Sequence, residues 1–327
     1  MISRFSLRSV FMLAGFFACA PIMAAESAHD WLMKINQAAR DLEYSGIFVY
    51  QHDDQINTMQ IFRKQIGKSL KERLVSLNGA PREIIRDANE VRCYWPDKNS
   101  VMVESRKASV KGFPNILPEQ LQSLSKYYDL MLSGTERVTG RLAQLVIIKP
   151  LDQYRYGYRL WADTGTGLLL KADVLDTAGA IVEQFMFTQV DIGASIPDAT
   201  LAPAMNGENM VWYREESGAP NASGKSAWTV TQLPNGFTLS THMMRRLPMR
   251  KQPVEHLVYT DGLAAVSVFI EKQEKGVKPF VQGASRMGAV HAMSARSGDY
   301  QITAVGEVPE ATVALIGASV TPTLNKQ

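Results

Sequence analysis

The sequence predicts an α+β fold in two domains, the larger of which is a long antiparallel sheet curled into an unclosed barrel around helices. The first observation is the stretch 126–187, where apolar residues recur at every second position and turn residues separate the runs. The second is the length of 327 residues, which exceeds one typical domain. The third is the segment 199–225, which lacks periodicity and is rich in Ala, Pro, Asn, Gly and Ser. We therefore expect a barrel domain over 26–198, a linker over 199–225 and a small α+β domain over 226–327.

The first 25 residues have the pattern of a secretory signal peptide. Arg4 and Arg8 precede an apolar run over 10–20, and alanines follow up to Ala25. The run is shorter than the roughly 18 residues that a membrane-spanning helix needs. A lipoprotein signal with Cys19 as the lipidated residue is the alternative, although the usual Leu three residues earlier is absent. We expect cleavage near Ala25 and a soluble protein in the periplasm.

Composition narrows the class of protein further. Hydrophobic residues make up 46% of the chain, which is typical of a globular protein. Without residues 1–25 the chain has 33 basic against 32 acidic residues, so nothing favours nucleic acid as a partner. Cys93 is then the only cysteine, which excludes an intrachain disulfide. Its neighbours are strand-like, and we interpret it as a small buried residue.

The first domain starts with an amphipathic helix over 27–42, which should pack across the sheet. Trp31, Ile35 and Ala38 form its apolar stripe. A second helix is expected after Pro118, running through the apolar positions as far as Met131. Between the helices we expect strands at 47–50, 56–63, 69–77, 82–86 and 91–94, and after the second helix the consecutive strands of 126–187.

The second domain should begin at Trp228. Its expected strands lie at 238–245, 255–260, 263–270, 289–296 and 300–306. Pro309 and Glu310 open a final helix over 311–319.

Catalytic motifs are absent from the sequence. Asp163-Thr164-Gly165 resembles half of an aspartic protease site, but such a site needs two copies and the sequence has one. The tripeptide also falls where the strand pattern requires a hairpin turn. The five histidines form no cluster with metal-ligand spacing, and no nucleophile elbow or complete dinucleotide-binding loop occurs. We therefore expect a binding protein and not an enzyme, without metal or cofactor.

A curled sheet offers a concave apolar face, which suits an acyl chain or an extended apolar peptide. The aromatic residues of the predicted meander are the candidates for this ligand face, and ordinary core packing is the alternative for each of them. The candidates are Tyr154, Tyr156, Tyr158, Trp161, Phe185 and Phe187.

Several segments, in this order along the chain, resemble the MucB/RseB family of periplasmic regulators of the envelope-stress sigma factor. No one of them is diagnostic alone, but together they span nearly the whole chain after residue 25. They are LNGAPREIIR at 77–86, LSKYYD at 124–129, WAD at 161–163 with the strand that follows, LPNGF at 233–237 after Trp228, and GEVP at 306–309.

The resemblance implies an N-terminal domain similar to lipoprotein carriers of the LolA type and a function in regulation. Such a protein binds the periplasmic part of an RseA/MucA-type anti-sigma factor and shields it from site-one proteolysis. Lipid or lipopolysaccharide triggers release. The alternative function is a periplasmic carrier of lipid or lipoprotein, which would not need the second domain. Self-association stays open at this stage.

Overall fold

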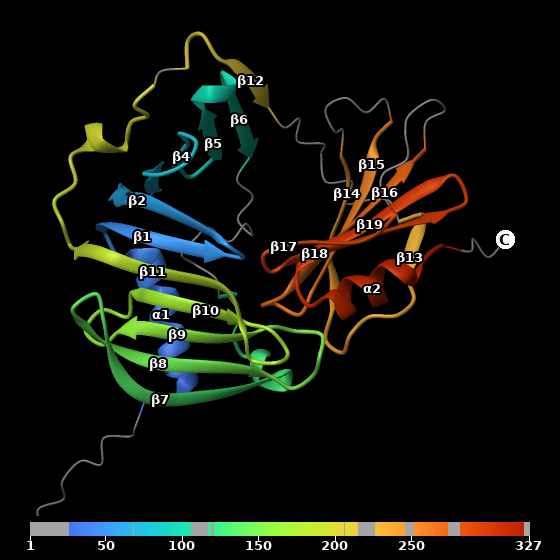
Figure 1. Cartoon of the computed structure of the whole chain (residues 1–327), viewed down its shortest axis with the longest axis horizontal. Coiled ribbons are helices and arrows are strands. Elements are labelled where there is room, and N and C mark those ends of the chain that lie inside the picture. Colours follow the sequence, from blue (N-terminus) through green and yellow to red (C-terminus); the bar gives the residue numbers. More distant parts are fainter. Residues whose placement is uncertain are drawn as a thin grey trace, which may run out of the picture.

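The computed structural model describes residues 26–67, 69–105, 117–118, 121–205, 207–214, 226–245, 252–273 and 282–323. Two large sheets, one from each half of the chain, lie side by side (Figure 1). The predicted signal peptide, including Cys19, lies outside the described residues.

The N-terminal half is a 12-stranded sheet in the order β12-β6-β5-β4-β3-β2-β1-β11-β10-β9-β8-β7. Among the described residues β12 and β7 are its two edges, so the sheet is open, as predicted. Every neighbouring pair is antiparallel except β12 and β6, which makes the sheet mixed and not purely antiparallel. The strands are β1 (Tyr44–His52), β2 (Gln55–Ile66), β3 (Ser69–Ser76), β4 (Glu83–Arg86), β5 (Glu90–Trp95), β6 (Ser100–Ser105), β7 (Tyr128–Val138), β8 (Arg141–Pro150), β9 (Gly157–Asp163), β10 (Leu169–Leu175), β11 (Ile181–Ile192) and β12 (Val211–Arg214).

The predicted meander is confirmed as the five consecutive strands β7 to β11. Its tight turns follow from local side chains. Between β10 and β11, for example, the Asp176 carboxylate accepts hydrogen bonds from the backbone N–H groups of Ala178 and Ala180, at 2.9 and 2.8 Å. Gly179 in this turn has φ +84°, a conformation that favours glycine.

Helix α1 (Ala28–Asp41) is the one α-helix in the described part of the N-terminal half, and it packs against β7, β8 and β10. Ser27 caps it: the hydroxyl accepts a hydrogen bond from the Asp30 N–H, and the Asp30 carboxylate accepts one from the Ser27 N–H. Trp31, Leu32 and Ile35 are buried against the sheet. The predicted helix across the sheet is therefore confirmed.

The second predicted helix, after Pro118, is wrong in the part that the structure describes. Only the 3-10 turn η2 (Leu124–Lys126) is helical there, and strand β7 starts at Tyr128. Tyr128 to Leu132 pair with β8. The apolar residues here have a helical spacing, but the run is too short to determine the structure by itself, and the strand pairing determines it instead. Leu121 and Leu124 still reach the core, as their apolar character requires.

Strands β6 and β12 were not predicted from the sequence. Because β12 lies within the predicted linker, its presence shortens that linker. The first part of the predicted linker over 199–225 contributes to the core and to the sheet. The 3-10 helix η3 (Asp198–Leu201) buries Leu201 completely, and β12 pairs with β6 in parallel. Between β5 and β6 the chain makes a further 3-10 turn, η1 (Pro96–Lys98). The N-terminal sheet therefore continues to Arg214.

The C-terminal half is a six-stranded antiparallel sheet in the order β14-β15-β16-β19-β18-β17, with helix α2 (Glu310–Ala318) on one face. The five predicted strands and the helix are present, and the short strands β13, β17 and β20 were not predicted. Val313 and Ile316 of α2 are fully buried in its core. The strands are β13 (Trp228–Val230), β14 (Thr238–Arg245), β15 (Val254–Thr260), β16 (Ala265–Lys272), β17 (Gly283–Met287), β18 (Val290–Ser297), β19 (Tyr300–Glu307) and β20 (Val320–Pro322), and β13 pairs with β20.

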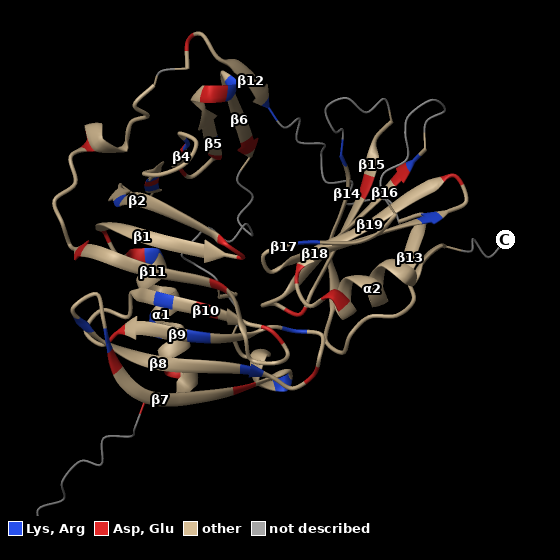
Figure 2. Ribbon diagram, in the orientation of Figure 1, with Lys and Arg blue, Asp and Glu red and all other residues tan. Residues whose placement is uncertain are grey.

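Among the described residues, basic and acidic positions are interspersed along the strands of both sheets (Figure 2). None of the helices in the described ranges is long and apolar enough to span a membrane.

Candidate functional site

The predicted ligand face is divided between three places in the structure. Tyr158, Phe185 and Phe187 lie on the face of the N-terminal sheet that α1 covers, and all three are buried. Phe185 and Phe187 stack edge to face at 5.1 Å between ring centroids, and Phe48 contacts both rings. These residues form the closed core of the domain.

Trp161 lies on the opposite face of the same sheet. It neighbours Lys171 across the strands, while Leu160 neighbours Ala172, and side chains alternate between faces along a strand. The indole N–H donates a hydrogen bond of 2.9 Å to Glu136, and the Lys171 ammonium lies 4.2 Å from the ring centroid. Trp161 therefore does not share a face with Tyr158 or the two phenylalanines.

Tyr154 and Tyr156 precede β9 and face the C-terminal domain. The Tyr156 hydroxyl lies 3.1 Å from the carbonyl oxygen of Ala289 and 3.0 Å from Nδ1 of His291. The Thr312 hydroxyl donates a hydrogen bond of 2.8 Å to the carbonyl of Tyr154. Tyr154 and Tyr156 therefore do not share the strand face of Tyr158, because β9 begins at Gly157.

A different apolar row runs across the N-terminal sheet from its core to its β12 edge. Ile61 and Leu74 are cross-strand neighbours in the core. They lie on the same face of the sheet as α1, which covers other strands of that face. Four residues continue the row by direct cross-strand pairing, and we call them the open row. They are Ile84, Cys93, Met102 and Tyr213.

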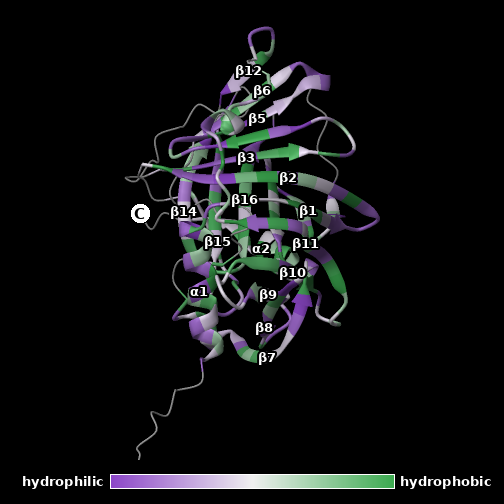
Figure 3. Ribbon diagram, turned by 90° about the vertical axis from the view of Figure 1, so that its left-hand side faces the viewer, coloured by the Kyte–Doolittle hydropathy of each residue, from purple (hydrophilic) through white to green (hydrophobic). Residues whose placement is uncertain are grey.

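Exposure rises from these two core residues to the end of the open row. Ile61 is fully buried and Leu74 is 3% exposed, whereas Met102 is 39% and Tyr213 is 50% exposed. Hydrophobic and hydrophilic stretches alternate along these strands, as expected for a sheet with two different faces (Figure 3). An apolar surface that is continuous with the core and open at one end matches what an acyl chain requires.

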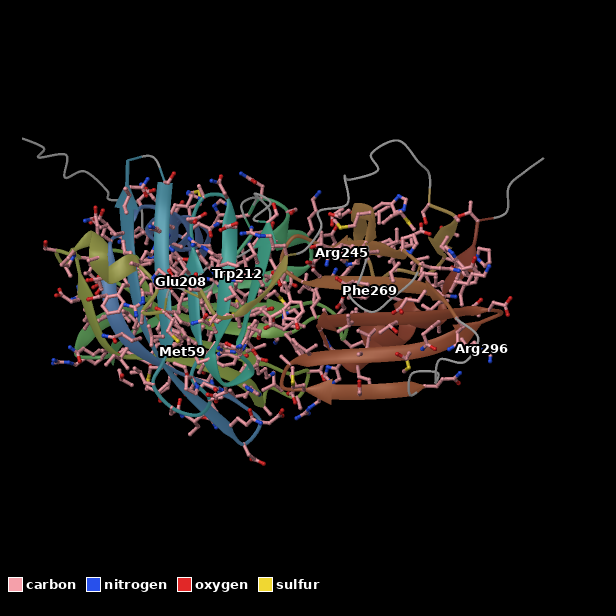
Figure 4. The ribbon with its side chains drawn as sticks, turned by 90° about the horizontal axis from the view of Figure 1, so that it is seen from above. Met59, Glu208, Trp212, Arg245, Phe269 and Arg296 are labelled. Carbon is pink, nitrogen blue, oxygen red and sulfur yellow. The ribbon has the colours of Figure 1, made fainter. Side chains whose placement is uncertain are left out.

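The opposite face of the same strands is closed. Ile85, Tyr94, Val101 and Val103 form a small core of their own, against which Met210 packs. Trp212 meets the Tyr94 ring edge to face at 6.2 Å, and its N–H bonds the Gly207 carbonyl at 3.0 Å. Figure 4 shows Trp212 and Glu208 in the N-terminal half, apart from Arg245, Phe269 and Arg296 in the C-terminal half. Among the described residues of these strands, the open-row face therefore carries the exposed Met102 and Tyr213, whereas Tyr94 and Val101 on the opposite face are buried.

A buried ion pair network lies beside the open row, at the end of α1. Arg63 pairs with Glu72 and also donates to the carbonyl of Ala39 near the helix C-terminus. Arg86 lies 3.5 Å from the second Glu72 oxygen. Because each charge has a partner, the network anchors the helix to the sheet and offers no free charge to a ligand.

Cys93 is the one thiol in the described residues and belongs to the open row. It is half-buried rather than fully buried. Burial raises the pKa of this thiol, and Glu104 adds to the shift, so it is a poor nucleophile at neutral pH. Its role in the row is apolar.

Asp163 ends β9, and its side chain holds the hairpin turn that the sequence predicted to follow. Its carboxylate accepts hydrogen bonds from the N–H and the hydroxyl of Thr166, both at 2.8 Å, and from Arg141 at 2.7 Å. Burial alone would raise the pKa of Asp163, but the bonds from Arg141 and Thr166 lower it. Among the described residues, no group of His, Cys, Asp and Glu could hold a metal ion.

Two family models match the chain and together cover most of it. The MucB/RseB N-terminal domain matches residues 27–205, and the MucB/RseB C-terminal domain matches residues 222–321. The family consists of regulatory proteins, so the prediction of a binding protein and not an enzyme is confirmed.

Two regulatory proteins are similar in sequence to this chain over nearly its full length. The sigma factor AlgU regulatory protein MucB of Pseudomonas aeruginosa is 34% identical over 96% of this chain and 97% of its own length. The sigma-E factor regulatory protein RseB of Escherichia coli is 26% identical over 88% of this chain and 89% of its own length.

Solved structures show the same similarity. A complex of Pseudomonas aeruginosa MucA and MucB matches with a TM-score of 0.70 and 32% identity, over 90% of this chain and 98% of that chain. MucB solved alone matches with a TM-score of 0.62 and 30% identity at the same coverage. The family models, the sequence identity and the structural similarity agree, and this chain belongs to the MucB/RseB family.

Proposed function

We propose that this protein binds the periplasmic part of an RseA/MucA-type anti-sigma factor, shields it from site-one proteolysis, and releases it when lipid or lipopolysaccharide binds. The observation that carries the proposal is the match, over 98% of that chain, to a protein solved in complex with MucA. Both domains of this chain take part in that match, because it covers 90% of the residues.

The open row supports the lipid part of the proposal. A regulator that senses lipid needs an apolar surface that an acyl chain can reach, and the buried aromatic core under α1 has no such access. Met102 and Tyr213 are reachable from solvent and lead to Leu74 and Ile61 in the core. The proposed ligand site is therefore the open row and not Tyr158, Phe185 and Phe187.

A cleavage assay with purified components tests the function. This protein is mixed with the periplasmic part of an RseA/MucA-type anti-sigma factor, and site-one protease is added. We expect equimolar protein to slow cleavage, and an acylated lipopolysaccharide fragment to restore it. The same fragment after deacylation should have no effect. Cleavage at an unchanged rate in the presence of this protein would refute the shielding role.

The periplasmic location is part of the same proposal. It rests on the signal-peptide pattern of residues 1–25 and on the family to which the chain belongs. Cell fractionation tests it: we expect the protein in the periplasmic fraction, with residues 1–25 removed. Recovery in the membrane fraction with an acylated Cys19 would favour the lipoprotein alternative instead.

A further inference from the structure

Arg155 is the most deeply buried charge at the junction between the two domains. It precedes β9, and its side chain is fully shielded from solvent. The Arg155 Nε donates to Oδ2 of Asp261 in the C-terminal domain, at 2.5 Å, and the Asp261 side chain is also fully shielded. A second guanidinium nitrogen donates to the carbonyl of Asn235, again across the junction. The third donates to Asp152 in the N-terminal domain.

Aromatic rings from both domains enclose the guanidinium. The Arg155 Cζ lies 4.9 Å from the ring centroid of Tyr127 in one domain and 5.1 Å from that of Phe237 in the other. The Tyr128 hydroxyl also bonds Oδ2 of Asp261 at 3.1 Å. The close approach requires Gly236, since a Cβ there would lie 2.2 Å from the Tyr127 ring. The two surfaces are therefore complementary in shape as well as in charge.

Further contacts surround this pair at the ends of the N-terminal strands. In the β1–β2 turn, Asp53 bonds Arg286 and the N–H of Gly288, both at 2.7 Å. Glu183 of β11 accepts a hydrogen bond of 2.9 Å from the N–H of Ala289. The β1–β2 turn lies beside β17 in Figure 1.

Apolar contacts accompany the polar ones at the junction. Leu263 and Ala289 of the C-terminal domain are buried in the hydrophobic core cluster of the N-terminal domain. A junction held mainly by polar contacts separates at a lower cost in exposed apolar area than a large hydrophobic interface does.

Each charged group of the pair keeps a partner inside its own domain. Asp152, which pairs with Arg155, also belongs to the N-terminal domain, and its other oxygen accepts a hydrogen bond of 2.9 Å from the N–H of Tyr154. In the C-terminal domain, Oδ1 of Asp261 accepts hydrogen bonds from the N–H groups of Leu263 and Ala264, at 2.9 and 2.7 Å. Separation of the domains therefore hydrates both charges without leaving either one buried and alone, which is the costly outcome for a broken buried pair.

We propose that Arg155 and Asp261 form a reversible latch, which holds the two domains in one orientation when closed and leaves two self-contained domains when open. The inference goes beyond the proposed function, because it concerns the two domains of this chain and holds whatever partner they bind. It follows from a fully buried ion pair that spans the junction while each member is satisfied locally.

Distance measurements between two spin labels test the latch directly. The labels are attached at Leu142→Cys and Leu239→Cys, which are exposed positions in different domains. Cys19 and Cys93 are replaced by Ser, and the protein is produced from the full coding sequence. We expect one narrow distance distribution for this background. Arg155→Met keeps the apolar stem but removes the guanidinium, so we expect a broader distribution with a shifted mean.

Arg159→Met is the matched control. Arg159 pairs with Asp173 at 2.6 Å within the N-terminal sheet, so its loss removes an ion pair without touching the junction. The control should keep the narrow distribution. Asp261→Asn gives a second test from the other domain, because the amide oxygen can still accept the bonds from Leu263 and Ala264. It should shift the distribution as Arg155→Met does.

Circular dichroism establishes that each variant is folded before the distances are compared. The latch predicts native-like spectra and altered distances for both Arg155→Met and Asp261→Asn. Unaltered distances in whichever of the two variants folds would overturn it, because the domains would then hold their orientation without the pair. An unfolded Asp261→Asn would overturn it too, since the latch requires each domain to be stable without the pair.

Discussion

Two regions of the same sheet differ in what covers them, although their strands have the same alternating pattern. Over β7, β8 and β10, helix α1 packs on the inner face, and the aromatic cluster of Phe48, Phe185 and Phe187 is buried in the same core. Over β4 to β6 and β12, the same face carries the open row, which ends at residues that are half exposed. Within the part of the chain that the structure describes, the inner face is therefore core where α1 lies on it and a candidate ligand surface where no helix does.

The largest expected effect is on stability, in the closed region. Phe187→Ala removes a fully buried ring, so the free energy of unfolding should fall by about 3–5 kcal/mol. Tyr213→Ala at the open end should change it by less than about 1 kcal/mol. Urea unfolding followed by circular dichroism measures both. Equal losses for the two variants would show that the regions do not differ in packing.

The second expected effect is on ligand binding, in the open region. Met102→Asp places a carboxylate in the open row, where an acyl chain would have to desolvate it. Because Met102 is 39% exposed, we expect a change in unfolding free energy below about 1 kcal/mol but loss of binding of a fluorescent fatty acid.

The matched control for that variant is Leu239→Asp, an exposed apolar position in the C-terminal domain, which is 49% exposed. It should leave fatty-acid binding unchanged. Retained binding in Met102→Asp would remove the open row from the ligand site.

The smallest expected effect is on the reactivity of Cys93. Burial raises the pKa of this thiol above its ordinary value, so less thiolate is present near pH 8 than in a free thiol. We expect slower alkylation by N-ethylmaleimide than for glutathione at pH 8. The rate should rise with pH up to that raised pKa, and saturating fatty acid should slow it further. Alkylation as fast as that of glutathione would mean that Cys93 is not shielded in the row.

The domain boundary gives a prediction that follows from the correction of the linker. Because η3 buries Leu201 and β12 is paired, we expect the first cuts in limited proteolysis to fall within 215–225, where the composition is that of a linker. Two fragments separated by mass spectrometry would identify the site. First cuts within 199–210 would instead support the predicted linker over 199–225.

Local pattern was sufficient for much of the fold. The meander, the first helix and the C-terminal strands have complete periodic stretches with caps and turn residues, so their types follow from neighbouring residues. Strand β12 has the run Val-Trp-Tyr inside a segment of linker composition, and its partner β6 lies far earlier in the chain. A pairing between such distant segments leaves no local signal.

The division of the aromatic residues could not be predicted for a related reason. Period two shows that residues share a face, but it does not show which part of that face a helix covers or which neighbour pulls a residue out of the strand. Tyr156 lies outside the strand next to Arg155, and both side chains bond the C-terminal domain. The open row extends over several strands, so only the sheet order makes it visible.

Photolabelling measures most directly which region binds a lipid. Palmitic acid that carries a diazirine is bound, irradiated and located by mass spectrometry of the digested protein. We expect labels on the peptides that contain Cys93, Met102 and Tyr213. In Met102→Asp these labels should be lost. Labels confined to the peptides that contain Tyr158 and Phe185 would contradict it, because the closed core would then be the ligand site.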